Sequence, residues 1–427
     1  MSISPARAAA FDVLLRIERE RAFSSVLLPM YEGGLSAADS ALCHELVLGT
    51  LRRQIKLDRL LDVLAPGKRL DLEVRIALRL GIYQLLFLTK IPPHAAINES
   101  VELVKRAKKS SASGFVNAIL RRASREALDI EYSDDLDRIS VETSHPSWMI
   151  ARWAIRLGLD VAESLAAINN EPAGLAFRLI GEPGGNIDEL IASATPSKRV
   201  DGCYLLDSST PLLRRVAAED RVYLQDEASQ MVAHAVELPS EGRFLDVCAA
   251  PGGKTGLVAS LHQPALTVAG DLHQARVELL RDNTRRQRAE VEVVRYDAEQ
   301  TLPFGEHEFG SVLVDAPCSG TGTIRHNPEI RYTLQPRDIE ELSFKQRRIL
   351  SQASKAVKKG GLLVYSTCSM EPEEGEEVAR SFLDSNHEFH LDRPKVAERF
   401  ITDEGFARTW PHRDRMDGFF IAALRKG

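Results

Sequence analysis

The first 127 residues repeat apolar side chains at the spacing of amphipathic helices. Stretches such as "ARAAAFDVLLRIE" and "LEVRIALRLGIYQLLFL" carry apolar residues at positions i, i+3, i+4 and i+7. Turn residues separate these stretches, with "GG" at 33–34, "PGK" at 66–68 and "PP" at 92–93. The pattern predicts an all-α bundle over residues 1–127, followed by an acidic, polar linker over residues 128–144.

The pattern changes twice beyond this linker. Residues 145–240 mix helical stretches with short apolar runs such as "LAFRLI" and "GCYLLD", which predicts a small α+β unit. Residues 241–427 alternate runs such as "RFLDVCA", "GSVLVDAP" and "GGLLVYST" with amphipathic stretches. This alternation predicts an α/β domain with a parallel sheet covered by helices on both faces. Ligands bind at the carboxyl ends of the strands in such domains, so the residues there are candidates for the site.

Composition indicates the class of protein and its cellular compartment. The chain has 427 residues, more than one hydrophobic core usually serves, and 44% of them are hydrophobic. It contains neither an apolar run long enough to span a bilayer nor a signal-peptide layout, so we expect a cytoplasmic protein without membrane association. The five cysteines lie too far apart for a CxxC zinc motif, and we expect no metal.

The net charge of −6 means that binding to nucleic acid must come from local basic patches. One such patch carries seven basic residues and no acid: Lys105, Arg106, Lys108, Lys109, Arg121, Arg122 and Arg125. A second comprises Arg52, Arg53, Lys56 and Arg59. Each patch is either a solvated helix face or a surface for RNA phosphates, and the sequence leaves both interpretations open.

A glycine-rich turn ends the first run of the α/β domain. "LDVCAAPGGKTG" has a strand, a tight turn and a helix start, and its glycines let the backbone approach a ligand. A P-loop would need glycine where Cys248 stands. Asp271 and Asp297 end the next two strands, where carboxylates suit ribose hydroxyls and an adenine amino group. The ordered set favours S-adenosylmethionine (SAM), although each acid alone is more often a helix N-cap.

Two further apolar runs each end in a cysteine. "VDAPCSGTG" carries Asp315 and Cys318, and "YSTCSM" carries Cys368. If these two strands are neighbours, both thiols project into one crevice beside the cofactor. Methylation of pyrimidine carbon 5 requires a thiolate to add to carbon 6, and a second thiol could assist release of the product. Asp315 is placed to bind N3 and the 4-amino group of cytosine, and the base must be flipped into the site.

These motifs resemble a known family. "DVCAAPGGKT", "GDL", "YDA", "DAPCSGTGTIR", "YSTCSMEPEE" and "DGFFIAALRK" are similar, in order, to the motifs of the Nop2/Sun RNA cytosine-5 methyltransferases. The N-terminal stretches "LVLGTLRRQIKLDRLL" and "PPHAAINESVELVKR" resemble the NusB-type RNA-binding domain. The sequence departs from the family pattern at His326, Asn327, Glu329 and Gly375, which bears on contacts with the substrate.

The resemblance implies a Rossmann-like SAM-dependent methyltransferase domain, with Cys368 as the nucleophile and Cys318 assisting release. It implies a SAM site made of Cys248, Ala249, Ala250, Pro251, Gly252, Gly253, Lys254, Asp271, Asp297 and Asp315. It also implies cytosine 967 of 16S rRNA as the target. We expect a monomer that acts on 16S rRNA or on a small-subunit assembly particle.

Two alternatives remain open. In DNA cytosine-5 methyltransferases the thiol of the Pro-Cys motif is the nucleophile, and that thiol would be Cys318 here. The chain could also be a non-enzymatic RNA-binding or assembly factor whose α/β domain is relict. Binding of SAM without methyl transfer to any rRNA would favour this second alternative.

Overall fold

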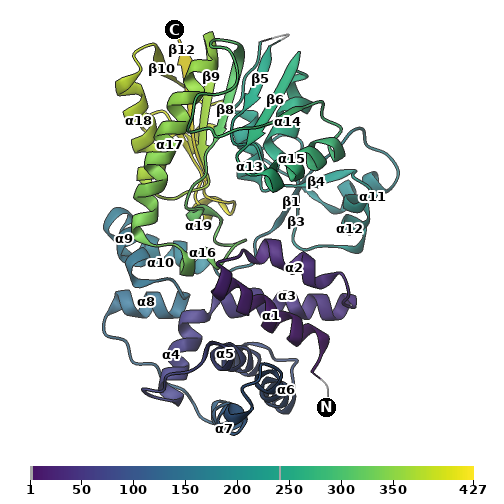
Figure 1. The fold of residues 1–427 in the computed structure, drawn as a ribbon, viewed down its shortest axis with the longest axis vertical. Helices are drawn as coiled ribbons and strands as arrows, with labels where there is room; N and C mark the ends of the chain where they lie inside the picture. The colour runs from purple at the N-terminus through teal and green to yellow at the C-terminus, as the bar shows by residue number, and fades with distance from the viewer. Residues whose placement is uncertain (1–2, 240–241) are drawn as a thin grey trace. The chain divides into compact units, whose positions relative to one another are not determined.

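The computed structural model describes residues 3–239 and 242–427, so the expected boundary at 240–241 falls outside the described residues. The chain forms two compact units (Figure 1). One comprises Met1–Pro172 together with Ile324–Leu334, and the other comprises Ala173–Thr323 together with Gln335–Gly427. Among the described residues, no helix is long and apolar enough to cross a membrane.

The first unit is helical. Its helices are α1 (Pro5–Glu20), α2 (Ser24–Glu32), α3 (Ala37–Arg52), α4 (Gln54–Leu64), α5 (Leu72–Phe87), α6 (Pro93–Arg106), α7 (Ser113–Ala123), α8 (Asp135–Thr143), α9 (Ser147–Leu157) and α10 (Leu159–Ile168). The apolar faces of α1 to α7 meet in one core, which confirms the helical prediction. Helix α8 lies inside the stretch expected to be a linker, and the Asp134 carboxylate caps it by accepting from the Asp137 N–H.

A short segment from late in the chain completes the helical unit. In Ile324–Leu334, Glu329 accepts a hydrogen bond from the Ser24 N–H at 2.6 Å, and the Ser25 hydroxyl bonds Asn327 at 3.0 Å. The buried Arg331 guanidinium donates to the Thr143 carbonyl at 3.1 Å. Burial lowers the pKa of Arg331 to about 10. Two of the departures from the family pattern, Asn327 and Glu329, therefore bind the first turn of helix α2.

The second unit begins with a small antiparallel sheet of order β2-β3-β1-β4. Its strands are β1 (Leu175–Leu179), β2 (Thr195–Pro196), β3 (Cys203–Leu206) and β4 (Val222–Leu224), with helices α11 (Asn186–Ser193) and α12 (Pro211–Ala218). Phe177, Leu190 and Val216 form its core. The Arg178 guanidinium donates to the Gly253 carbonyl at 3.1 Å, which ties this sheet to the glycine-rich turn of the larger domain.

The larger sheet has the order β10-β12-β9-β8-β5-β6-β7. Its strands are β5 (Arg243–Asp246), β6 (Leu266–Asp271), β7 (Glu292–Arg295), β8 (Phe309–Asp315), β9 (Val357–Thr367), β10 (Phe389–Asp392) and β12 (Phe420–Lys426), and β11 (Ala407–Arg408) pairs with β12. Strands β5 to β9 run parallel, whereas β12 is antiparallel to both neighbours. The strand pattern confirms the predicted α/β domain.

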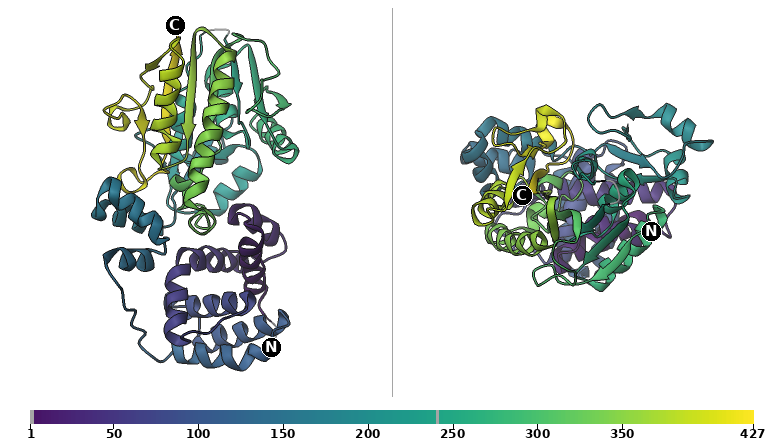
Figure 2. Two further views of the ribbon diagram at one scale, coloured as in Figure 1. Left: turned by 60° about the vertical axis from the view of Figure 1, so that its left-hand side comes forward. Right: turned by 90° about the horizontal axis from the view of Figure 1, so that it is seen from above.

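Helices cover both faces of this sheet. On one face, α17 (Pro336–Ala356) and α18 (Glu376–Ser385) lie side by side and pack on Val312 and Val314 (Figure 2). On the other, α13 (Glu227–His234) and α14 (Gly253–His262) pack on Leu313. Successive residues of a strand point to opposite faces, which is why an unbroken apolar run was the correct signal for a strand buried on both sides.

Candidate active site

The site lies where the parallel strands end. A cavity of about 350 Å³ opens there, beyond β5, β6, β7, β8 and β9. Its lining includes predicted site residues from all of these strand ends: Cys248, Ala250, Asp271, Asp297, Asp315, Cys318 and Cys368. The other predicted residues, Ala249, Pro251, Gly252, Gly253 and Lys254, belong to the turn and helix start beside the cavity.

The glycine-rich turn is built for close packing. Gly252 has φ of +100°, and a Cβ there would meet the Leu280 side chain at 2.9 Å, so a larger residue would have to push helix α15 (Gln274–Arg286) away. The Ala250–Pro251 peptide bond is cis. Helix α14 starts at Gly253 and directs its first N–H groups toward the end of the sheet.

Two of the predicted acidic residues, Asp271 and Asp297, accept hydrogen bonds from nearby groups of the protein. The Asp271 carboxylate accepts from the Ala250 N–H at 3.3 Å and from the Arg276 guanidinium at 3.0 Å. Asp297 accepts from the Glu299 N–H at 3.0 Å, as a turn-forming aspartate does. Both carboxylates nevertheless line the cavity, so each combines a local structural role with a surface that faces a ligand.

Asp315 and Lys254 form a partly buried ion pair that the sequence did not predict. Lys254 Nζ donates to Asp315 Oδ2 at 2.7 Å, and the Ser366 hydroxyl donates to Asp315 Oδ1 at 2.7 Å. Burial by itself would lower the pKa of Lys254, but the Asp315 carboxylate outweighs it and raises that pKa. A negative charge on Cys368 would act in the same direction. Lys254 is therefore a permanent cation between the carboxylate and the thiol.

The two thiols meet because their strands are neighbours. Strand β8 pairs with β9 so that Asp315 lies opposite Ser366, and Cys318 Sγ lies 3.3 Å from Cys368 Sγ. The hydrogen bond with Cys368 and burial raise the pKa of Cys318 well above its usual value. The raised pKa keeps the proton on Cys318, and the two sulfur atoms are within hydrogen-bonding distance of each other. The third thiol at this edge, Cys248, has its pKa raised by burial and stays unreactive.

The loop after Cys318 packs directly on the loop after Cys368. The Gly322 N–H donates to the Cys368 carbonyl at 3.0 Å, and the Gly418 N–H donates to the Gly322 carbonyl at 2.9 Å. A Cβ on Gly322 would overlap the Gly418 carbonyl and would lie 2.9 Å from the Cys368 carbonyl. These are backbone atoms, which cannot rotate away.

If Cys368 is the nucleophile that the sequence predicts, we expect Gly322→Ala to lose about tenfold or more in methyl-transfer rate, because displacement of the Cys368 backbone would move its sulfur. Overpacking should also destabilise the unit by about 1–3 kcal/mol. Urea unfolding and single-turnover methyl transfer measure the two effects. Gly174→Ala is the matched control, because its Cβ would have an ordinary 3.9 Å neighbour. A Gly322→Ala protein with wild-type kinetics would contradict the tight packing.

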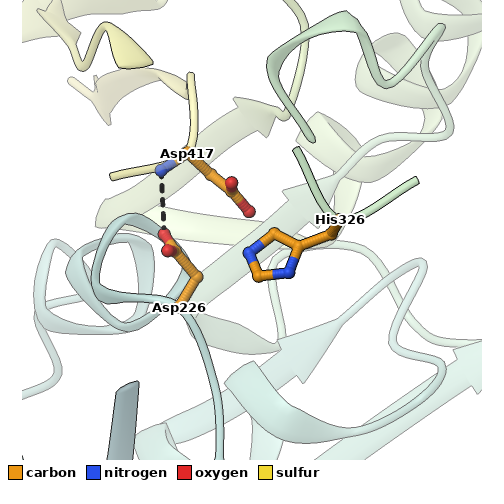
Figure 3. Close-up of side chains that lie close together, drawn as sticks. All are labelled: Asp226, His326 and Asp417. Carbon is orange, nitrogen blue, oxygen red and sulfur yellow. Dashed lines mark hydrogen bonds between the residues drawn. The ribbon is translucent and has the colours of Figure 1, made fainter. Parts of the chain in front are cut away.

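The C-terminal loop that carries Gly418 is tied to helix α13. The Asp417 N–H donates to Asp226 Oδ1 at 3.2 Å (Figure 3). The same oxygen accepts from the Ala228 N–H at 2.8 Å, at the first turn of the helix. His326, also drawn in Figure 3, belongs to the helical unit. One aspartate thus caps a helix and anchors the loop behind the thiols.

The two basic patches differ in how their side chains pair with acidic residues. In the second, Arg59 pairs with Asp137 at 2.6 Å and Lys56 with Glu142 at 2.6 Å, so these cations hold helix α8 in place. Arg52 donates to the Arg325 carbonyl at 3.3 Å. The first patch pairs mostly in exposed positions, as in Lys109 with Asp71 at 2.8 Å. Exposed pairs are weak and exchange readily for phosphate, so the first patch is the better candidate for RNA.

The cavity fits the predicted cofactor. Its carboxylates suit the hydroxyls and the positive charge of SAM, and Val247, Leu272, Ala298 and Ile349 supply apolar walls for an adenine ring. The thiols line one part of the same cavity, beside the carboxylates. When bound, SAM supplies an electrophilic methyl group. The residues present could hold the cofactor and a nucleobase against each other.

Comparisons with known proteins identify the family of the chain. Residues 233–425 match the family model described as 16S rRNA methyltransferase RsmB/F, and residues 4–125 match the NusB family. The chain is 34% identical to the probable ribosomal RNA small subunit methyltransferase B of Bacillus subtilis, over 100% of both chains. It is 34% identical to ribosomal RNA small subunit methyltransferase B of Pseudomonas putida, over 98% of both.

A solved structure shares the whole architecture. The crystal structure of PH0851 superposes with a TM-score of 0.85 and 25% sequence identity, and the match covers 100% of both chains. The likeness therefore extends through the helical unit, the small sheet and the large sheet. The chain belongs to the RsmB/F family of SAM-dependent 16S rRNA methyltransferases, with a NusB-family domain ahead of the methyltransferase domain.

Proposed function

We propose that this methyltransferase modifies carbon 5 of a cytosine in 16S rRNA, at position 967, through a covalent adduct between Cys368 and carbon 6. One observation carries the proposal: two thiols lie 3.3 Å apart in a cavity that also contains the Asp315 carboxylate. Methylation at an exocyclic nitrogen or a ribose oxygen would use neither thiol. Methylation at carbon 5 requires two steps in which a thiol can act, namely activation of the ring and release of the product.

The electrostatics favour Cys368 as the nucleophile. Burial and the contact with Cys368 favour the protonated form of Cys318, and the Lys254 cation would stabilise a charge that forms on Cys368. Attack forms the bond from Cys368 Sγ to carbon 6 and makes carbon 5 nucleophilic. Asp315, held by Lys254 and Ser366, would accept hydrogen bonds from the 4-amino group of the base as charge develops.

Release of the product breaks the bond that Cys368 formed with carbon 6. After methylation the carbon 5 proton passes to a base, its electron pair restores the double bond between carbons 5 and 6, and the bond from carbon 6 to Cys368 Sγ breaks with both electrons going to the sulfur. Cys318 Sγ lies 3.3 Å from Cys368 Sγ, and we assign Cys318 the assisting role: it gives its proton to the departing Cys368 sulfur, and the thiolate so formed takes the proton from carbon 5. We further infer that the protein acts as a cytoplasmic monomer on 16S rRNA or on a small-subunit assembly particle.

The test uses 16S rRNA transcribed with tritium at carbon 5 of every cytosine. The wild-type protein and SAM are expected to release one tritium per methyl group transferred, and nucleoside analysis should find 5-methylcytidine. A transcript with uridine at position 967 should release none, which identifies the target. Methyl transfer without tritium release would overturn the carbon 5 assignment, and unchanged release from the altered transcript would overturn the position.

A further inference from the structure

A carboxylate lies behind the two thiols, where it has no surface exposed to solvent. Glu374 ends the short 3-10 helix η3 (Pro372–Glu374), and its exposed fraction is 0%. Within the described part of the chain, it is not among the residues that line the cavity. A carboxylate is costly to bury unless hydrogen bonds replace its water. The hydrogen bonds of Glu374 should therefore indicate why a carboxylate is buried here.

Those hydrogen bonds come from the residue that follows each reactive cysteine. Ser319, next to Cys318, donates its N–H to Glu374 Oε1 at 2.8 Å and its hydroxyl to Oε2. Ser369, next to Cys368, donates its hydroxyl to Oε2 at 2.5 Å. The two serine oxygens lie 3.1 Å apart. One carboxylate thus binds both cysteine loops at the same distance along the chain from each sulfur.

Glu374 is itself fixed by elements outside these loops. From helix α17, Gln346 Nε2 donates to Glu374 Oε1 at 3.0 Å and to the Pro317 carbonyl at 3.0 Å. From strand β9, the Tyr365 hydroxyl donates to the Glu374 carbonyl at 2.6 Å. A helix and a strand therefore fix Glu374, and Glu374 in turn fixes the two cysteine loops.

We propose that Glu374 is a positioning residue that sets the separation of Cys318 and Cys368 by binding Ser319 and Ser369 with one carboxylate. It acts through these serines and does not touch the substrate. The role in methyl transfer rests on the proposed function, whereas the effect on thiol separation does not. Both cysteines lie beyond the last paired residues of their strands, Asp315 in β8 and Thr367 in β9, so the sheet alone does not fix the two sulfurs.

The first test compares Glu374→Gln with wild type. Glutamine keeps the size but turns one acceptor oxygen into an amino group that faces serine donors. We expect kcat for methyl transfer to fall about 10- to 100-fold, since misplacement of reacting groups by an ångström has effects of this size. The SAM dissociation constant and the KM for 16S rRNA should stay within about twofold, because Glu374 lines neither binding surface. Glu377→Gln, which removes the same charge from helix α18, is the matched control.

The second test reads the thiol separation without RNA or SAM. Diamide takes up two electrons and two protons from a pair of nearby thiols and leaves a disulfide. Mass spectrometry of the peptides that contain Cys318 and Cys368 measures its rate of formation. We expect wild type and Glu377→Gln to cross-link alike, and Glu374→Gln to cross-link about tenfold more slowly.

Single serine variants keep the inference testable if Glu374→Gln fails to fold. Ser319→Ala and Ser369→Ala each remove a hydroxyl donor and leave the carboxylate in place. Each should slow kcat and cross-linking about three- to tenfold, and neither should add to the loss in Glu374→Gln, because the three residues act as one unit. Wild-type cross-linking and wild-type kcat in Glu374→Gln, or in both serine variants, would overturn the inference. A wild-type protein that cross-links but makes no 5-methylcytidine would overturn the proposed function alone.

Discussion

Replacing Cys318 with alanine is expected to trap the protein on its RNA. Cys368 would still attack carbon 6 and the base would still be methylated, but the thiol that assists release would be gone. The adduct should accumulate as a band that resists denaturation, disappears with RNase and requires SAM. We expect turnover to fall about 100-fold or more, in line with the loss of a positioned proton-transfer group.

Cys368→Ala is the partner experiment, and it should give neither adduct nor product. The double variant Cys318→Ala with Cys368→Ala should also give no adduct, which shows that the trapped bond is made by Cys368. Cys43→Ala serves as the control for removal of a thiol, since Cys43 is buried in the core of the helical unit. An adduct in Cys368→Ala that is lost in Cys318→Ala would reverse the two roles, as in the DNA cytosine-5 methyltransferases.

Replacing Lys254 with methionine is expected to cost nearly as much. The Lys254 ammonium group pairs with Asp315 at 2.7 Å, lies 5.0 Å from the centre of the Phe419 ring and interacts with the charge of Cys368. Methionine fills the same volume without the charge, so Asp315 would lose its cationic partner, and a charge that forms on Cys368 would lose its nearby cation. We expect single-turnover methyl transfer to slow about 100- to 1000-fold, the usual effect of removing one electrostatic group from an active site.

A second measurement separates this effect from a loss of folding. Alkylation of Cys368 by iodoacetamide at pH 7 should also slow in Lys254→Met, because the thiolate is the reactive form. Lys254→Arg should recover part of both rates, since it restores the charge in a different shape. Lys359→Met removes an exposed lysine of strand β9 and should change neither rate. Unchanged alkylation and methyl transfer in Lys254→Met would show that the ion pair is only structural.

Local patterns were enough to predict the architecture and the cofactor. The helical spacing of the first 127 residues and the unbroken apolar runs beyond residue 241 are short-range properties, because each reports which faces of an element are buried. The order of the strand-end motifs then indicated the cofactor, since parallel strands bring their carboxyl ends to one edge of the sheet. Cys318 and Cys368 could be paired as candidates on the single assumption that their strands are neighbours.

Only the tertiary structure decided how those groups act. The contact between Cys318 and Cys368, the pairing of Lys254 with Asp315 and the anchor at Glu374 all join residues that are far apart in sequence or on different elements. The segment Ile324–Leu334 likewise belongs to the helical unit although its neighbours in the chain belong to the α/β unit. Sequence periodicity shows that a side chain is buried, but it does not show which distant residues surround that side chain. The partner of a buried charge is set by the packing of whole elements, and that information appears only once the chain is folded.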